Sequence, residues 1–137
     1  MDKIDLKIIE ILKENSKSSM KDIGNKVNLT GQAVNLRIAK LEEQNIIQRY
    51  TIETDEKMFN CHIHAFINIY MHKISHAPYL NFVKEEEKYI KSNYKVVGDG
   101  CYLLECKFPN EEHLNSFLER LNKHANYKIT TVLQNND

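Results

Sequence analysis

The spacing of apolar residues changes near residue 60, and this change limits what the chain can fold into more than any other feature. Before it, apolar side chains recur every three or four residues, which is the spacing of helices. From Ile63 the period becomes two, and β-branched and aromatic residues dominate, which is typical of strands. We therefore expect a helical unit over residues 1–52, a linker over 53–62 and a second unit over 63–137.

Three helices are predicted in the first unit. Asp2, Ser19 and Thr30 each precede a run with helical spacing, and each suits the N-cap position. Asn45 tolerates the left-handed conformation that ends a helix. Residues 46–52 follow as a short β stretch. The pattern therefore predicts a winged helix-turn-helix with a modest wing.

The second unit alternates strands and helices in the order β-α-β-β-α-β. This order is the ferredoxin-like arrangement, a four-stranded antiparallel sheet with two helices on one face. The uncovered face of such a sheet invites pairing with a second copy. The chain as a whole is therefore expected to be of the α+β class. The predicted elements are a strand over 63–71, a helix opened by residues 75–78, strands over 90–96 and 101–108, a helix capped by Asn110, and a strand over 127–133.

Charge gives only a local argument for a nucleic-acid partner. The 19 acidic residues cancel the 19 basic ones, so the net charge does not favour nucleic acid. Between Lys17 and Arg49, however, basic residues outnumber acidic ones, as phosphate contacts would require. A neutral protein with one such surface should bind weakly as a monomer, which favours a dimer or a larger assembly.

Neither secretion nor membrane insertion is expected. The acidic start MDKIDLKIIE is not a signal peptide, and no apolar stretch reaches the roughly 20 residues that span a bilayer. The three cysteines form no disulfide framework. We therefore expect a reducing, cytoplasmic location and no membrane partner.

Residues 19–47 read as two short helices joined by a tight turn, the geometry that lays a helix in the major groove of DNA. Gln32 and Asn35 could bond adenine edges, and Leu36 could contact a thymine methyl. Basic and hydroxyl side chains would contact phosphates. Alternatively, Gln32 and Asn35 are only solvated, and Arg37 is a structural residue that bonds neighbouring carbonyls. The candidate DNA contacts are Ser19, Lys21, Thr30, Gly31, Gln32, Asn35, Leu36, Arg37, Lys40 and Arg49.

Histidines gather around the start of the second unit. His62 and His64 lie two apart beside Cys61, and His72 and His76 lie four apart. Imidazole and thiolate suit zinc, but the spacing lacks a further paired ligand. We expect solvated or interface histidines, and no metal or other cofactor.

Two other patterns are assigned to structure. Cys101 and Cys106 are an odd number of positions apart on a strand, so they face opposite sides and cannot pair. The charged run at residues 84–88 is expected to be a solvated helix face.

An ordered set of residues along nearly the whole chain matches one known family. The set comprises Asp2, Asp5, Ile8, Ile9, Leu12, Ser19, Asp22, Ile23, Leu29, Thr30, Ala33, Val34, Arg37, Ile38, Leu41, Glu42, Ile46, Ile47, the turn at 98–100, and Leu114, Phe117, Leu118 and Leu121. By these residues the chain resembles the Lrp/AsnC family, the feast/famine transcriptional regulators. The resemblance implies a homodimer formed by the second domain, often four dimers in a disc, with an amino acid or related metabolite bound between subunits.

The glycine turn is the candidate effector site. Cys101 stands where many members of the family have an Asp close to the effector. The alternative is a plain hairpin turn that needs Gly at positive φ. The candidate effector-binding residues are Gly98, Asp99, Gly100, Cys101 and Tyr102.

We therefore expect a sequence-specific regulator of transcription that binds double-stranded DNA and responds to a small metabolite. One alternative is an enzyme, because some proteins that resemble this family are decarboxylases of tetrapyrrole precursors that use His and Arg. The second unit offers only Arg120 for a multiply carboxylated substrate, so no catalytic residue is expected. Another alternative is a ligand-binding or assembly protein that no longer reads DNA.

Overall fold

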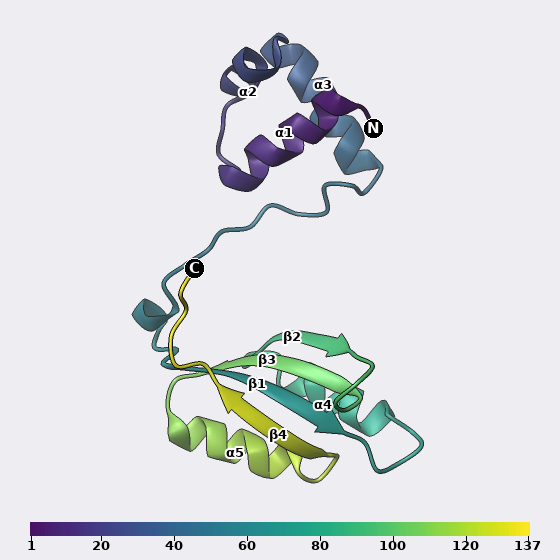
Figure 1. Ribbon diagram of the computed structural model, residues 1–137, viewed down its shortest axis with the longest axis vertical. Coiled ribbons are helices and arrows are strands. Elements are labelled where there is room, and N and C mark those ends of the chain that lie inside the picture. The colour runs from purple at the N-terminus through teal and green to yellow at the C-terminus, as the bar shows by residue number, and fades with distance from the viewer. The chain divides into compact units, whose positions relative to one another are not determined.

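The computed structural model describes residues 1–137 and divides into two compact units (Figure 1). The helical unit comprises Met1–Thr54, and the sheet unit comprises Asp55–Asp137. No helix in either unit is both long enough and apolar enough to cross a membrane.

The helical unit begins each helix at a side chain that caps it. Asp2, Ser19 and Thr30 each accept a hydrogen bond from the backbone N–H three residues further on, as expected of N-caps. Asn45 has a φ of 58°, the left-handed conformation predicted for the residue after this helix. The helices are α1 (Lys3–Glu14), α2 (Met20–Val27) and α3 (Gly31–Glu43).

A small aliphatic core holds these three helices together. Ile8 of α1, Ile23 of α2 and Val34 of α3 are fully buried. Ile38 lies one turn beyond Val34 and belongs to the same cluster. The apolar stripe of α3 therefore faces inward, which directs its polar residues outward.

The predicted wing strand over residues 46–52 is wrong. The segment contains no strand, and its backbone has no partner strand within the chain. Instead, the backbone N–H groups of Ile46 and Ile47 bond the carbonyl of Leu41, and the Tyr50 hydroxyl donates to Glu42 at 2.7 Å. Local β propensity without a second strand to pair with does not produce a sheet.

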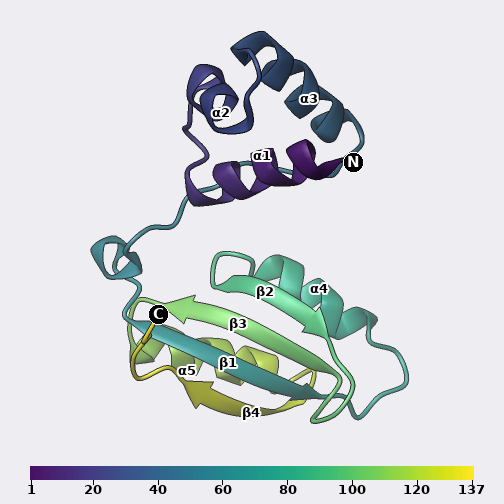
Figure 2. The same ribbon diagram turned by 45° about the horizontal axis from the view of Figure 1, so that its top comes forward.

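The sheet unit is a four-stranded sheet with two helices on one face (Figure 2). The strand order is β2-β3-β1-β4, and every neighbouring pair is antiparallel. This is the ferredoxin-like arrangement predicted, and it makes the chain α+β. The elements are a 3₁₀ turn η1 (Glu56–Phe59), β1 (Ile63–Tyr70), α4 (Ala77–Glu85), β2 (Ile90–Lys95), β3 (Tyr102–Phe108), α5 (Glu111–Leu121) and β4 (Asn126–Thr131).

Aromatic side chains fill the space between the sheet and its two helices. Phe117 of α5 is fully buried, and its ring lies 5.1 Å from that of Phe108 and 5.3 Å from that of Phe82. The opposite face of the sheet carries the alternate residues of each strand, among them Phe66, which is only half-buried. The unit therefore buries one side of its sheet and leaves the other open.

The charged run at residues 84–88 is not entirely a solvated face as predicted. Helix α4 ends at Glu85, and Glu86 follows with only 8% of its surface exposed. Both of its carboxylate oxygens accept from Arg120 of α5, through Nε and Nη2. Glu86 is therefore buried because it pairs with Arg120, which lies 34 residues further along the chain.

Candidate functional site

The tight turn between α2 and α3 depends on a glycine. A Cβ placed on Gly24 would lie 2.3 Å from the carbonyl oxygen of Leu29, so no side chain fits there. Asn28 adopts the left-handed conformation that ends α2, with a φ of 58°. The turn is therefore packed directly against the helix that precedes it.

The N-terminal ends of α2 and α3 lie close together. A Cβ on Gly31, the first residue of α3, would be 3.3 Å from the backbone nitrogen of Lys21 in the first turn of α2. Both helix ends carry the positive end of the helix dipole and free N–H groups, and such ends favour anions. Ser19 and Lys21 are exposed beside them. This arrangement suits a phosphate of a nucleic-acid backbone.

The outward face of α3 presents the residues predicted to read bases. Gln32 and Asn35 are exposed, and Leu36 is 67% exposed. Lys40 is also exposed and forms no ion pair. Side chains of this kind on an outward helix can bond base edges or contact a thymine methyl. Their contact with DNA stays a prediction.

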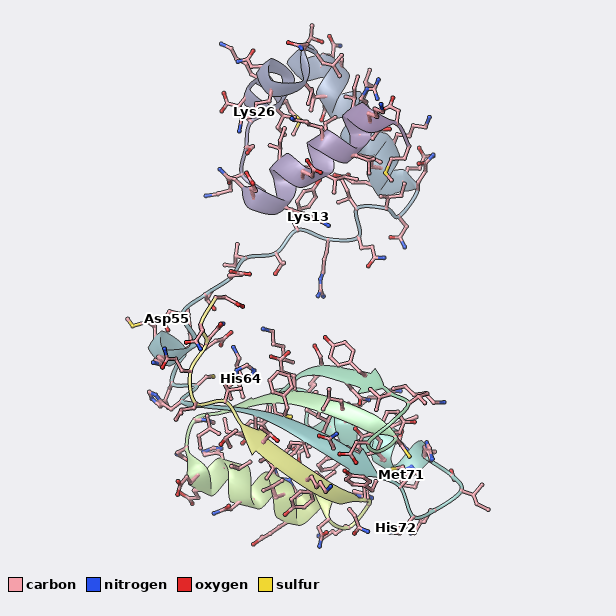
Figure 3. All side chains as sticks on the ribbon, viewed as in Figure 1. Lys13, Lys26, Asp55, His64, Met71 and His72 are labelled. Carbon is pink, nitrogen blue, oxygen red and sulfur yellow. The ribbon has the colours of Figure 1, made fainter.

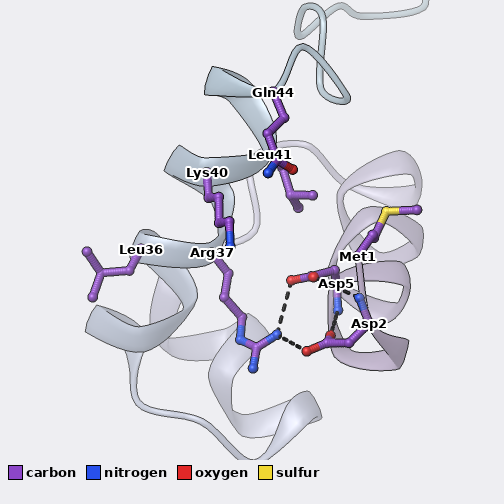
Figure 4. Close-up of a pocket in the computed structure, with 8 residues that line it drawn as sticks. All are labelled: Met1, Asp2, Asp5, Leu36, Arg37, Lys40, Leu41 and Gln44. Carbon is purple, nitrogen blue, oxygen red and sulfur yellow. Dashed lines mark hydrogen bonds and ion pairs between the residues drawn. The ribbon is translucent and has the colours of Figure 1, made fainter.

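Arg37 differs from its neighbours because its side chain turns back toward α1 (Figure 4). Its Nη1 donates to Asp2 at 2.7 Å and to Asp5 at 3.1 Å. The hydrogen bond from Arg37 lowers the pKa of Asp2 to about 2, and the two carboxylates raise the pKa of Arg37. The guanidinium is thus bonded within the chain, which agrees with a structural role, although its predicted partners were carbonyls.

Arg49, the last candidate DNA contact, lies in the extended segment after α3 and is exposed. Its neighbour Tyr50 holds this segment to α3 through Glu42. Burial and the bond to Glu42 raise the pKa of Tyr50 to about 12, so its hydroxyl remains a donor at neutral pH.

The candidate effector turn is held by residues that sequence reasoning missed. The Asp99 carboxylate accepts from the Tyr70 hydroxyl and lies 4.0 Å from Nζ of Lys128. Asn68 donates its side-chain amide to the carbonyl of Asp99 at 3.0 Å. Asn68 and Tyr70 lie two apart on β1, so strand alternation could have shown that they share a face, but not that the turn reaches them.

Both glycines of the turn have positive φ, 130° at Gly98 and 94° at Gly100. Gly100 is also tightly placed, because a Cβ there would lie 2.7 Å from the carbonyl oxygen of Ile69. The next residue, Cys101, donates its backbone N–H to that same carbonyl. The turn is therefore fixed to the end of β1, which agrees equally with a plain hairpin and with a rigid binding loop.

Tyr102, although predicted with Asp99 as part of the effector site, lies on the other face of the sheet from it. It is 5% exposed and belongs to the core on the helix side of the sheet. Its hydroxyl lies 2.9 Å from Nδ1 of His76. Asp99 bonds Tyr70, whose side chain points to the other face because it alternates with the buried Ile69.

The four histidines beside Cys61 and the end of β1 are not gathered at one point. His64 pairs with Glu105 at 2.6 Å, and His62 bonds Asn60. Figure 3 shows His64 and His72 at opposite ends of β1. No group of three or more His, Cys, Asp or Glu side chains is placed to hold a metal ion.

The buried cysteine and the arginine of the sheet unit both have structural roles, Cys106 in the core and Arg120 in an ion pair. Burial raises the pKa of Cys106 to about 12, so its thiol stays protonated. Arg120 is bonded to Glu86, which raises its pKa. The arginine that the enzyme alternative would require is thus bonded to a carboxylate within the chain.

Comparison with known proteins assigns the two halves separately. Residues 1–48 match the model of a winged helix-turn-helix DNA-binding domain. Residues 64–135 match the model of the Lrp/AsnC ligand binding domain. The HTH-type transcriptional regulator LrpA of Bacillus subtilis is 50% identical over 133 residues, which cover 97% of this chain and 98% of that protein. The chain belongs to the Lrp/AsnC family.

Other relatives of this Lrp/AsnC family member agree. LrpB of B. subtilis, also an HTH-type transcriptional regulator, is 36% identical over 94% of this chain and 86% of its own length. The structure of B. subtilis LrpC superposes with a TM-score of 0.92 at 26% identity, covering 100% of this chain and 97% of LrpC. The chain therefore has the domains and the fold of a DNA-binding transcriptional regulator.

Proposed function

We propose that this Lrp/AsnC family member is a sequence-specific regulator of transcription whose DNA binding responds to an amino acid or a related small metabolite. The observation that supports it best is α3, which buries Val34, Ile38 and Leu41 and exposes a polar face. That face begins where two helix N-termini meet. A helix of this kind fits the major groove, while the paired N-termini suit phosphates.

The candidate contacts divide into two roles. Gln32, Asn35 and Leu36 would contact base edges and so determine which sequence is bound. Contacts to the DNA phosphates would come from basic side chains and from the N-terminal ends of α2 and α3. They would add affinity without specificity. The second group comprises Ser19, Lys21, Thr30, Gly31, Lys40 and Arg49.

The assembly would be a homodimer formed through the sheet unit, with four dimers in a disc as a further step. The open face of the sheet carries half-buried apolar side chains such as Phe66 and Leu103, which a second copy would cover. A dimer presents two copies of α3 to half-sites about 34–36 Å apart, or a multiple of that distance. It would also multiply weak single contacts through effective concentration.

The effector would bind at the turn at 98–100. Tyr70 and Asn68 hold this turn in place through their bonds to Asp99. The effector would act by binding one arrangement of the assembly better than another, since only differential affinity shifts an equilibrium. No catalytic step is assigned, and the protein would work in the cytoplasm, where the DNA it reads lies.

The test uses a duplex selected from a random library by the full chain. Asn35→Ala should bind selected and random duplexes with more similar affinity, because a base contact is lost. Lys40→Met should lose affinity evenly on both duplexes, with a salt slope reduced by about one. Lys13→Met, an exposed cation at the end of α1, is the matched control and should bind as the parent does. Failure of the full chain to enrich any duplex would contradict the proposal.

A further inference from the structure

The contact between Arg37 and the start of α1 combines a helix cap with an ion pair. The Asp2 carboxylate accepts from the Asp5 backbone N–H with one oxygen and from Arg37 with the other. The Asp5 carboxylate does the same, with one oxygen on the Asp2 backbone N–H and the other on Arg37. Each acid therefore completes the capping box of α1 and holds the middle of α3 at the same time.

These are the only side-chain hydrogen bonds in the helical unit that join two helices. The other contacts between α1 and α3 lie in the aliphatic core, which packs the two helices together but contains no directed bond. The side chain of Asp5 is 16% exposed, so its bond to Arg37 is partly shielded from water. Among the polar contacts, this pair alone defines how α3 is turned relative to α1.

The surroundings of Arg37 also disfavour a phosphate. Its guanidinium is already bonded to two carboxylates, and Asp2 is ionised at neutral pH. A phosphate could bind Arg37 only by competing with these two carboxylates and breaking their bonds to it. Figure 4 shows Arg37 directed at both acids while the adjacent Leu36 points away from them.

We infer that Arg37 is a positioning residue for DNA recognition, which sets the orientation of α3 through Asp2 and Asp5 and makes no phosphate contact. The inference rests on the proposed function, because it assumes that the outward face of α3 reads DNA. It predicts that the effect of Arg37 on DNA binding disappears when its two partners are removed.

The experiment is a mutant cycle on the full chain with the selected duplex. Arg37→Met keeps the aliphatic stem and removes the charge, and Asp2→Asn with Asp5→Asn removes the partners while keeping residues that can cap a helix. Arg37→Met alone should weaken binding about tenfold, a typical coupling within one contact network, with an unchanged salt slope. In the doubly substituted background it should weaken binding by less than about twofold.

Lys40→Met is the matched control, because Lys40 lies three residues on and has no ion pair. It should reduce the salt slope by about one in both backgrounds. Arg37→Lys keeps the charge, but its Nζ lies one bond short of the Nη1 that reaches both carboxylates. It should therefore lose affinity with an unchanged slope, whereas a phosphate contact would tolerate lysine. Circular dichroism of each variant confirms folding, and Arg37→Lys replaces Arg37→Met in the cycle if the latter unfolds.

A reduced salt slope for Arg37→Met, or an equal loss of affinity in both backgrounds, would overturn the inference and make Arg37 a phosphate contact. An unchanged affinity in the parent background would overturn it as well. If instead the parent chain and every variant fail to bind the duplex, the proposed function fails, which is a separate result.

Discussion

The two units of this chain are stabilised by different means. The core of the helical unit is wholly aliphatic, with Ile8, Ile23 and Val34 at its centre. The core of the sheet unit is built around aromatic rings, with Phe108 and Phe117 packed edge to face. Aromatic side chains bury more surface each and gain further energy from ring geometry. Each core residue of the sheet unit therefore buries more surface on average than a core residue of the helical unit.

The difference suggests how each unit keeps its functional surface in place. A helical unit that ends at Thr54 has a small core, and small cores leave little spare stability. Its reading helix is placed by two specific contacts, namely the tight turn at Gly24 and the bonds from Arg37 to Asp2 and Asp5. In the sheet unit the strands themselves fix the open face. We expect the free energy of unfolding to be most sensitive to core substitutions in the sheet unit. In the helical unit it should be most sensitive to substitutions at the Gly24 turn or at Arg37 and its partners.

The largest effect is expected from Phe117→Ala. It removes a fully buried ring between Phe82 and Phe108, which should lower the free energy of unfolding by about 3–5 kcal/mol. Leu118→Ala on the same helix is the control, because Leu118 is only half-buried and should cost clearly less. Urea unfolding followed by tyrosine fluorescence measures both. Equal losses for the two variants would contradict the view that the buried aromatic rings contribute most to the stability of the sheet unit.

A smaller effect is expected from Gly24→Ala in the helical unit. The new Cβ would meet the Leu29 carbonyl at 2.3 Å, so the turn must move, at a cost of about 1–3 kcal/mol. Gly31→Ala is the control, because its nearest contact would be 3.3 Å and a shift of a few tenths of an ångström suffices. Circular dichroism at 222 nm against urea reports the helices. A greater loss at Gly31 would contradict the view that the turn limits this unit.

The elements of both units were largely predictable because their signals are local. Asp2, Ser19 and Thr30 cap their helices through bonds to residues three positions away, a distance that a sequence shows directly. The period of two from Ile63 onward likewise follows from strand alternation. The order of strands and helices then left the ferredoxin-like arrangement as the simplest solution.

The partners of the polar side chains were not predictable, because they lie far away in the sequence. Arg37 bonds Asp2 across 35 positions, Arg120 bonds Glu86 across 34, and Tyr70 bonds Asp99 across 29. One sequence contains no record of such pairs. The strand predicted over residues 46–52 is absent for a related reason, since a strand needs a partner and propensity alone does not supply one.

The smallest effect is a dependence of stability on pH, which tests the bond between Arg37 and Asp2 directly. The bond from Arg37 lowers the folded-state pKa of Asp2 from 3.8 to about 2. A carboxyl with a depressed folded pKa stabilises the fold above its unfolded pKa, and this contribution is lost as pH falls from about 4 to about 2. The side chain of Asp2 is 55% exposed, so the change in stability should be small and should shrink further with added salt.

Carbon-detected NMR titration of the Asp2 carboxyl measures this directly. Arg37→Met should return the pKa of Asp2 toward 3.8, because the largest cause of its depression is removed. The backbone N–H of Asp5 also bonds this carboxyl, so part of the depression should remain. If the pKa of Asp2 is unchanged in Arg37→Met, the capping box alone accounts for it. The link between α1 and α3 would then be too weak to distinguish the helical unit from one held by packing alone.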